Sequence, residues 1–387
     1  MQVTNAILPT DLERALLVGR VWRENVGPAV VVVRQGEMFD ITRHAPTVSA
    51  LFERADLHQL LMQADGEPLG PVAALANEAG ASEGVLLMAP CDLQPIKACG
   101  VTFAVSLLER VIEERAKGDP ARAAELRKEI QSRIGADLSE IRPGSEAAMQ
   151  LKADLLERGL WSQYMEVGIG PDAEVFTKSQ AMSAVGHGTA VGIHPESKWN
   201  NPEPEIVLAV NSAGVALGAT LGNDVNLRDI EGRSALLLGK AKDNNASCAI
   251  GPFIRMFDQH FSIDTVRNAE VSLRIEGEDD GFQLAGTSRM REISRDPLDL
   301  VKQTCGRHHQ YPDGFMLFLG TMFSPTKDRD AAGSGFTHHL GDRVSISSPA
   351  LGTLVNQVQR SDQLPPWTFG VRALYSNLAQ RGIAFGE

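Results

Sequence analysis

The sequence predicts an α+β protein, mainly β, with a large β-rich domain and a smaller N-terminal α/β domain. Residues 1–90 mix short apolar runs with turns, and residues 105–158 are rich in helix-forming residues. From about Glu166 onward, short β-prone runs alternate with Gly, Pro, Asn and Asp. With 43% hydrophobic and 22% charged residues, the 387-residue chain has the composition of a globular protein and the length for two domains.

The N-terminal unit contains the apolar run Ala29–Val33 and the turn Asp65–Pro68. This mixture of runs and turns is typical of a small α/β unit. It carries no cluster of chemically reactive side chains. We place the domain boundary near Ala89 and Pro90, so that residues 1–90 and 91–387 form the two predicted domains.

The central segment is predicted to be helical over Val105–Arg133 and again over Ser145–Arg158. Leu108, Val111 and Ile112 recur at helix spacing, with Glu, Arg and Lys between them. A helical excursion between β segments can form a lid over a site, and a packed helix pair is the alternative.

The C-terminal part is predicted to be a set of short strands. They are Glu174–Lys178, Glu205–Val210, Val215–Thr220, Val271–Ile275, Phe315–Leu319 and Arg343–Ser347. No fixed-period repeat accompanies them, so a solenoid or a propeller is not expected.

Charge and composition exclude several classes of function. The net charge of −12 and the lack of a Lys/Arg stripe argue against nucleic acid as a partner. No apolar run approaches the roughly 20 residues of a membrane span, and the N-terminal residues lack the pattern of a signal peptide. We therefore expect a cytoplasmic protein without a membrane partner. The four scattered cysteines are expected to be buried reduced thiols.

Two acids at the start of an apolar strand form the most informative motif. Glu203 and Glu205 are two residues apart, so both carboxylates point to one face of the strand. A hairpin that turns at Asn211–Gly214 brings Asp224 opposite them, within a residue or two. Three such carboxylates repel one another unless a cation binds, and their oxygens suit Mg²⁺, Mn²⁺ or Ca²⁺. The alternative is a pair of exposed acids with an unrelated Asp.

Other candidates lie around this cluster. Lys242 is placed to bind an anionic substrate or to move a proton, although most lysines are simply solvated. Glu174 and Lys178 share a strand face and are predicted to line the same pocket. After the run that ends at Leu319, the Gly320 amide and the Thr321 hydroxyl are placed to grip a carboxylate. The histidine pairs, His308–His309 and His338–His339, have no metal-ligand spacing and are interpreted as surface or structural residues.

Five motifs in this order resemble the fumarylacetoacetate hydrolase superfamily over residues 88–387. They are Glu203-Pro-Glu205, Gly222-Asn-Asp224-Val-Asn-Leu-Arg228-Asp229, Lys242 followed by Gly251-Pro252, Gly320-Thr321, and Leu351–Asn356. The resemblance implies a β-roll catalytic domain with a small N-terminal α/β domain, an Mg²⁺ (or Mn²⁺) site made by Glu203, Glu205 and Asp224, an essential Lys242, and a homodimer or homotetramer. Our candidate substrate-binding residues are Phe103, Ser106, Lys178, Asn223, Arg228 and Thr321.

One departure from the superfamily bears on the reaction. Hydrolases of this group carry a His and a Glu that activate water, and the matching stretch here keeps Glu109 but has Ser106 in place of the His. Serine is not a base at neutral pH, which favours chemistry without added water. Phrases such as Gly100–Val105 and His309–Gly314 are similar to those of bacterial 2-keto-3-deoxy-pentonate dehydratases of non-phosphorylative D-xylose and L-arabinose degradation.

That similarity implies conversion of 2-keto-3-deoxy-D-xylonate (the same compound as 2-keto-3-deoxy-D-arabinonate) to 2,5-dioxopentanoate, the semialdehyde of 2-oxoglutarate. Our hypothesis is that Lys242 moves the C3 proton while Glu174 or Glu109 assists departure of the C4 hydroxyl. One alternative is a C–C bond hydrolase of a 2,4-dioxo acid, of the acylpyruvase or diketo-deoxy sugar acid type. Another is a non-catalytic protein that binds a structural Ca²⁺.

Overall fold

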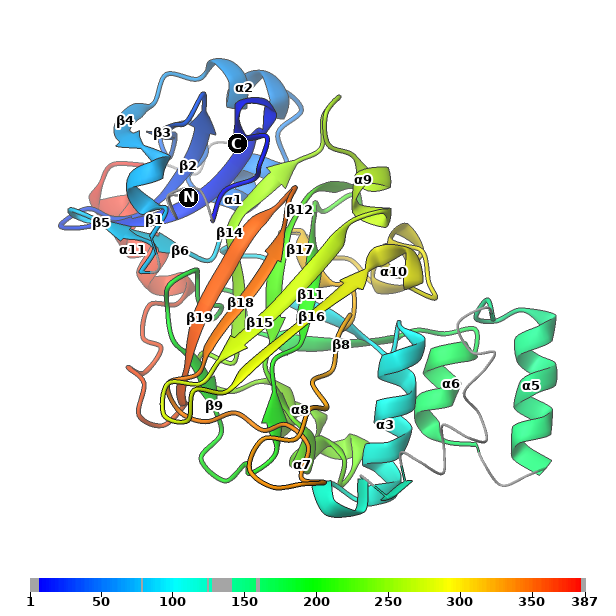
Figure 1. The fold of residues 1–387 in the computed structure, drawn as a ribbon. Coiled ribbons are helices and arrows are strands. Elements are labelled where there is room, and N and C mark those ends of the chain that lie inside the picture. Colours follow the sequence, from blue (N-terminus) through cyan, green and yellow to red (C-terminus); the bar gives the residue numbers. More distant parts are fainter. Residues whose placement is uncertain (1–6, 78, 124, 127–140, 158–160, 384–387) are drawn as a thin grey trace.

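Two large β-sheets and a helical lobe form most of the protein in a computed structural model that describes residues 7–77, 79–123, 125–126, 141–157 and 161–383 (Figure 1). The helices α3 (Ala104–Ala116), α5 (Glu146–Glu157) and α6 (Gln163–Ile169) lie together at one end, away from the N-terminal strands (Figure 1). The predicted α+β class with dominant β-structure is confirmed.

The larger sheet joins the N-terminal strands to the central ones. Its order is β4 (Glu67–Pro71), β3 (Glu37–Asp40), β2 (Gly27–Arg34), β1 (Leu17–Arg23), β14 (Cys248–Met256), β12 (Ala216–Asp224), β11 (Pro204–Val210), β17 (Phe315–Phe318), β7 (Ile96–Gly100) and β8 (Glu174–Ser179). The short strands β5 (Ala81–Ser82) and β6 (Val85–Met88) pair with each other, and β6 also pairs with β1.

The hairpin of β11 and β12 has the register that the sequence predicted. Glu205 lies opposite Gly222, and the backbone N–H of Asp224 donates to the carbonyl oxygen of Glu203 at 3.0 Å. A register shift next to Val210 accommodates the turn. The two acidic motifs therefore meet at the same end of the hairpin.

A second sheet packs against the first around an apolar core. Its order is β16 (Gln283–Arg289), β15 (Glu270–Glu276), β18 (Arg343–Ser348), β19 (Gly352–Arg360) and β9 (Val191–Ile193). Ile206 and Leu208 of β11 enter the core shared with this sheet, whereas Val207 and Ala209 enter the core beneath the N-terminal helices. This alternation follows from the two-residue period of a strand and buries β11 on both faces.

The N-terminal unit is bound to the rest through its strands and helices. Strand β1 pairs with β14, and the helices α1 (Val48–Phe52) and α2 (Leu57–Gln63) cover a core to which β14 contributes Ile250 and Ile254. The C-terminal helix α11 (Val371–Gln380) returns to this unit, where Asn377 Nδ2 donates to the Val26 carbonyl at 2.8 Å. A domain boundary at residue 90 stays a proposal, and the sheet is continuous across it.

The first predicted helix is interrupted in the structure. Helix α3 ends where Lys117 and Gly118 adopt positive φ angles of 55° and 75°, and a new turn begins at Asp119. Gly118 favours the end of a helix and Pro120 favours the start of one. The apolar periodicity continues across both residues, so it suggested a single helix. The predicted helix limits at Arg133 and Arg158 lie outside the described residues, and helix α5 accounts for most of the second helix.

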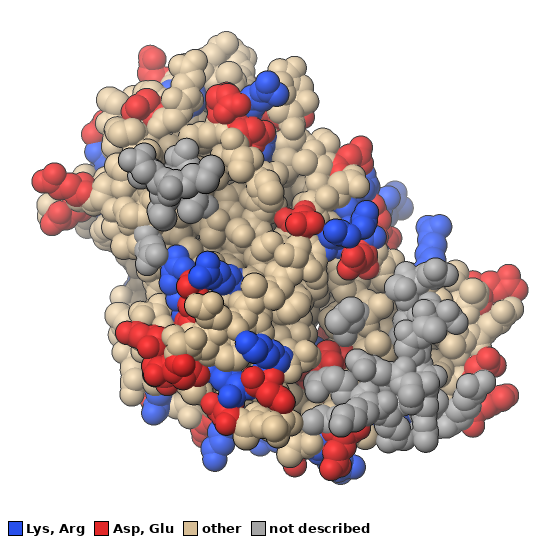
Figure 2. Space-filling model, in the orientation of Figure 1, with Lys and Arg blue, Asp and Glu red and all other residues tan. Residues whose placement is uncertain are grey.

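Short elements complete the fold. They are the strand pair β10 (Asn200–Asn201) and β13 (Asn226–Leu227), and the helices α7 (Arg228–Glu231), α8 (Leu238–Lys242), α9 (Ile263–Arg267) and α10 (Pro297–Thr304). Within the described ranges, no helix is both long and apolar enough to cross a membrane. On the face drawn in Figure 2, the described Lys and Arg side chains lie among Asp and Glu rather than in one basic area.

Candidate active site

Three buried carboxylates converge at the end of the β11–β12 hairpin. One ligand oxygen from each of Glu203, Glu205 and Asp224 lies within 4.8 Å of the others. Asn223 holds the strand ends together, because its Oδ1 accepts a hydrogen bond of 3.2 Å from the Glu203 backbone N–H. The convergence predicted from the E-x-E motif and the hairpin is thus present in the structure.

Glu205 carries the least compensated charge of the three acids. Its Oε2 accepts a hydrogen bond of 2.6 Å from the Gly320 backbone N–H, and within the described part of the chain no Lys or Arg forms an ion pair with it. Burial, followed by the charges of Asp224 and Glu203, raises the pKa of Glu205 well above its usual range. The Gly320 amide, which the sequence indicated as a donor to a carboxylate, binds the carboxylate of Glu205.

Two lysines bind the cluster through different oxygens of Asp224. Lys242, at the end of α8, pairs with Glu203 and, at 3.0 Å, with Asp224. Burial alone would lower the pKa of Lys242, but the charges of Asp224 and Glu203 raise it above its usual range. Lys178 is fully buried: its Nζ pairs with Asp224 Oδ1 at 2.8 Å and donates to the carbonyls of Val225 (3.1 Å) and Lys242 (2.5 Å).

The register of β8 explains why Lys178 is buried. Thr177 pairs with Lys97 and Ser179 pairs with Ile96, so Lys178 is the extra residue of a β-bulge. Bulges redirect side chains near functional sites. With three oxygen acceptors around its ammonium group, Lys178 fixes Asp224 and does not line the cavity described below.

A buried arginine that sequence reasoning missed lies beside Glu203. Arg110 of α3 hydrogen-bonds to Glu203 and to Glu113 (2.6 Å), and it pairs with Glu231 of α7 at 2.6 Å. Burial would lower the pKa of Arg110, but these three carboxylates raise it well above its usual range. The feature of the sequence that could have identified Arg110 is a charged residue on the apolar face of a predicted helix, directly after Glu109.

Glu174 adds a further carboxyl group to the lining of the site. Burial and the nearby charge of Glu231 raise its pKa to about 7, although Arg110 and Lys242 act in the opposite direction. Its carboxylate lies against Gly100 of the neighbouring strand, where an added Cβ would approach Glu174 Oε2 to 1.9 Å. A glycine at this position leaves the space that the carboxylate occupies.

These groups surround a narrow cavity of about 10 Å³, near the size of one water molecule. It is lined by Cys99, Gly100, Val101, Arg110, Glu174, Phe176, Glu203, Glu205, Asp224, Glu231, Lys242 and Thr321. The predicted metal ligands, Lys242, Glu174 and Thr321 therefore meet in one place.

The remaining predicted residues lie behind this lining. Phe103 is buried at the start of α3, and its carbonyl accepts a hydrogen bond of 2.8 Å from the Ser106 hydroxyl. Arg228 pairs with Glu113 at 3.1 Å and donates to the Pro325 carbonyl at 3.0 Å. Phe103, Ser106, Glu109, Asn223 and Arg228 do not line the cavity as it is formed here.

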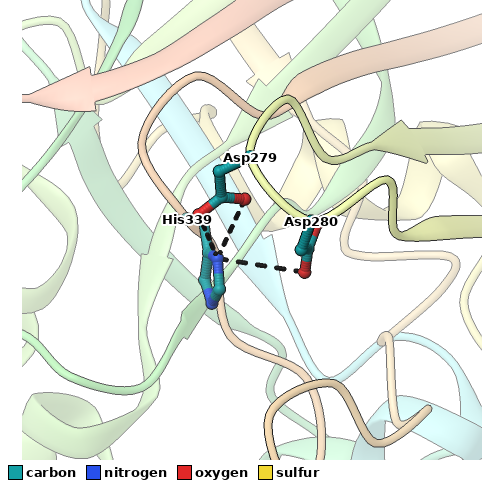
Figure 3. A group of neighbouring side chains, drawn as sticks. All are labelled: Asp279, Asp280 and His339. Atoms are coloured by element: carbon teal, nitrogen blue, oxygen red, sulfur yellow. Dashed lines mark hydrogen bonds and ion pairs between the residues drawn. The ribbon is translucent and has the colours of Figure 1, made fainter.

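The buried carboxylates fit a hard divalent cation. Three carboxylate oxygens at the end of the β11–β12 hairpin are a donor set that suits Mg²⁺ or Mn²⁺. A second group, Asp279, Asp280 and His339, does not fit as well (Figure 3). Arg329 already binds Asp280 at 2.8 Å and lowers its pKa, and His339 lies between Asp279 and Asp330 at 2.9 Å from each.

Comparison with known proteins identifies the family. A family described as fumarylacetoacetate (FAA) hydrolase, C-terminal, matches residues 157–359, which is more than half of the chain. The chain belongs to the fumarylacetoacetate hydrolase family. The resemblance drawn from the motifs is thereby confirmed, and the match covers the carboxylate cluster and Lys242 of this family member.

Two curated relatives are sugar-acid dehydratases. The chain is 31% identical over 189 residues to 2-dehydro-3-deoxy-D-arabinonate dehydratase of Saccharolobus solfataricus, covering 48% of this chain and 59% of that protein. It is 30% identical over 202 residues to the probable 2-keto-3-deoxyxylonate dehydratase of Haloferax volcanii, covering 52% of this chain and 65% of that protein. The matches thus span less than two thirds of these relatives.

Solved structures share the fold. A 2-keto-3-deoxy-D-arabinonate dehydratase complexed with magnesium and 2,5-dioxopentanoate has a TM-score of 0.62 and 18% identity, over 89% of this chain and 99% of that one. The apo form of such a dehydratase has a TM-score of 0.64 at 19% identity, with the same coverage. At these identities, the likeness establishes the β-roll fold of the family.

Proposed function

We propose that the protein catalyses the metal-dependent dehydration of 2-keto-3-deoxy-D-pentonate (xylonate or arabinonate) to 2,5-dioxopentanoate. The observation that carries the proposal is the cavity itself, which joins three buried carboxylates to Lys242 and to a Glu174 with a pKa near 7. The two relatives named as dehydratases support the substrate class. No histidine is among the described lining residues, which favours elimination of water over its addition.

In this proposal, Glu203, Glu205 and Asp224 hold Mg²⁺ or Mn²⁺. The ion would polarise the 2-oxo acid, and its positive charge would offset the carboxylates that keep the Lys242 ammonium group protonated. Lys178 and Asn223 are positioning residues, because they fix Asp224 and Glu203 without lining the cavity. Thr321 lines the cavity and supplies a hydroxyl for the substrate.

The protein groups handle two proton transfers in our proposal. Lys242 takes the C3 proton at Nζ, and Glu174 gives a proton to the departing C4 hydroxyl, which leaves as water. Glu174 is preferred over Glu109 because Glu174 lines the cavity and is partly protonated near pH 7. Loss of a proton from C5 and return of one to C3 then move the double bond to C4–C5. The resulting enol takes a proton at C4 and loses its hydroxyl proton, which gives the C5 aldehyde.

Parallel assays of two substrates test the proposal. Purified protein with Mg²⁺ is expected to consume 2-keto-3-deoxy-D-pentonate and to leave a 2,4-dioxo acid unchanged, and EDTA is expected to stop turnover. The variant Lys242→Ala should lose turnover while it retains Mg²⁺ binding in calorimetry. Cleavage of the 2,4-dioxo acid, or substantial turnover by Lys242→Ala, would contradict it. A cytoplasmic location, a place in D-xylose or L-arabinose degradation, and a homodimer or homotetramer complete the proposal.

A further inference from the structure

The three carboxylates around Arg110 are held unequally. Glu113 and Glu203 accept hydrogen bonds from its guanidinium group, whereas Glu231 Oε2 lies 2.6 Å from Nη1 as an ion pair and makes no hydrogen bond. Ion pairs without hydrogen-bond alignment gain less than bidentate or aligned ones. Glu231 is therefore the least firmly bound of the three partners.

The other interactions of these three acids also indicate that Glu231 is the least firmly bound partner of Arg110. Glu203 also binds Lys242 and is a proposed metal ligand, and Glu113 also pairs with Arg228 at 3.1 Å. Among the described residues, Glu231 forms no ion pair other than that with Arg110. It is 4% exposed, so its carboxylate is nearly dehydrated. Glu231 can leave Arg110 without disturbing the metal ligands.

Glu231 lies between two cavities. It lines the narrow cavity of the carboxylate cluster and also an outer cavity of about 530 Å³, beside Tyr164 of α6. Lys117 and Arg233 line the outer cavity together with the acids Glu114 and Glu231. This volume accommodates a five-carbon acid, which the narrow cavity does not. Glu231 is thus a lining residue that the two cavities share.

We propose that Glu231 occupies, on Arg110, the position that the carboxylate of the substrate takes during binding. The proposal rests on the proposed function for the substrate class, a small 2-oxo acid. Exchange of one carboxylate for another leaves the charge on Arg110 balanced. A planar guanidinium binds a carboxylate with directional hydrogen bonds, which Glu231 does not receive. Arg110 is then a substrate-binding residue, and Glu231 competes with the substrate.

Binding of 2-oxobutyrate tests this competition without turnover, because this 2-oxo acid has no C4 hydroxyl to lose. Calorimetry in saturating Mg²⁺ is expected to give about 10-fold tighter binding for Glu231→Gln than for the wild type, since no acid has to be displaced. Arg110→Lys is expected to weaken binding about 10-fold. The control Glu114→Gln removes the same charge from the outer cavity without touching Arg110, and should leave the Kd within twofold. Mg²⁺ affinity in the absence of 2-oxobutyrate should stay within twofold for Glu231→Gln.

Equal or weaker binding by Glu231→Gln would overturn the proposal, as would a gain of the same size in Glu114→Gln. If Glu231→Gln does not fold, as judged by its thermal unfolding, Glu231→Asp withdraws the carboxylate from Arg110 and should also tighten binding. The outcome is distinguishable from failure of the proposed function. If 2-oxobutyrate binds in this pattern but the wild type does not dehydrate a pentonate, the proposed reaction is refuted. The proposed anion site on Arg110 is then retained.

Discussion

Replacement of Glu205 by Gln is expected to stabilise the metal-free protein while it removes metal binding. Glu205 is buried beside Asp224 and Glu203 and has no cationic partner within the described residues, so its raised pKa reflects a destabilising charge. A Gln side chain can still accept the hydrogen bond from the Gly320 N–H. The substitution thus removes the charge and keeps the hydrogen bond.

The size and the pH dependence of this effect follow from linkage. A folded-state pKa above the unfolded value means that stability is full below the unfolded pKa, near 4.3, and declines as pH rises towards the folded pKa. At pH 7 the loss is at most about 3.7 kcal/mol, the cost of about 2.7 pH units at 1.36 kcal/mol each. The advantage of Glu205→Gln should therefore be near zero at pH 4 and largest near neutral pH.

Thermal unfolding in EDTA is the assay. At roughly 1 °C per kcal/mol for a chain of this length, Glu205→Gln should raise the midpoint by up to about 4 °C at pH 7. Glu203→Gln is the matched control, because it breaks the pairs with Arg110 and Lys242 and should cost about 3–5 kcal/mol. Destabilisation of equal size in both variants would refute the reasoning. Added Mg²⁺ should stabilise only the wild type.

Further predictions concern the metal and the acid. At a concentration 100 times its Kd, Mg²⁺ should stabilise the wild type by about 2.7 kcal/mol in chemical unfolding, and no change on addition would count against a metal site. Glu174→Gln should lower kcat about 10²–10⁴-fold. Because Glu174 donates a proton, wild-type kcat should fall as pH rises above about 7, and a flat profile would reject this role. Asp280→Asn should leave Mg²⁺ affinity unchanged in calorimetry, because Arg329 already neutralises that acid. A weaker affinity would indicate that Mg²⁺ binds at Asp280 instead.

Local rules predicted the carboxylate cluster well. The turn at Asn211–Gly214 and the two-residue period of a strand are enough to place Asp224 opposite Glu203 and Glu205. Their register is set by contacts within about 20 residues of chain, which a single sequence carries. Glu174 was found for the same reason, since strand alternation places it on the inner face of β8.

The parts that sequence reasoning missed depend on how distant elements dock. Arg110 meets Glu203 and Glu231 only because α3 packs beside the hairpin and α7, and no periodicity encodes that contact. The β-bulge that buries Lys178 depends on pairing with β7, some 80 residues earlier. The pairing of β1 with β14 is likewise non-local, and no pattern in the sequence indicates it.

The most direct test of the proposed reaction is the identity of its product. Purified protein with Mg²⁺ is incubated with 2-keto-3-deoxy-D-pentonate, and the mixture is followed by proton NMR. The arrangement of Lys242, Glu174 and the three carboxylates predicts 2,5-dioxopentanoate, seen as a new C5 aldehyde with two neighbouring methylene groups. Pyruvate together with glycolaldehyde would show cleavage between C3 and C4 and would contradict the proposed dehydration.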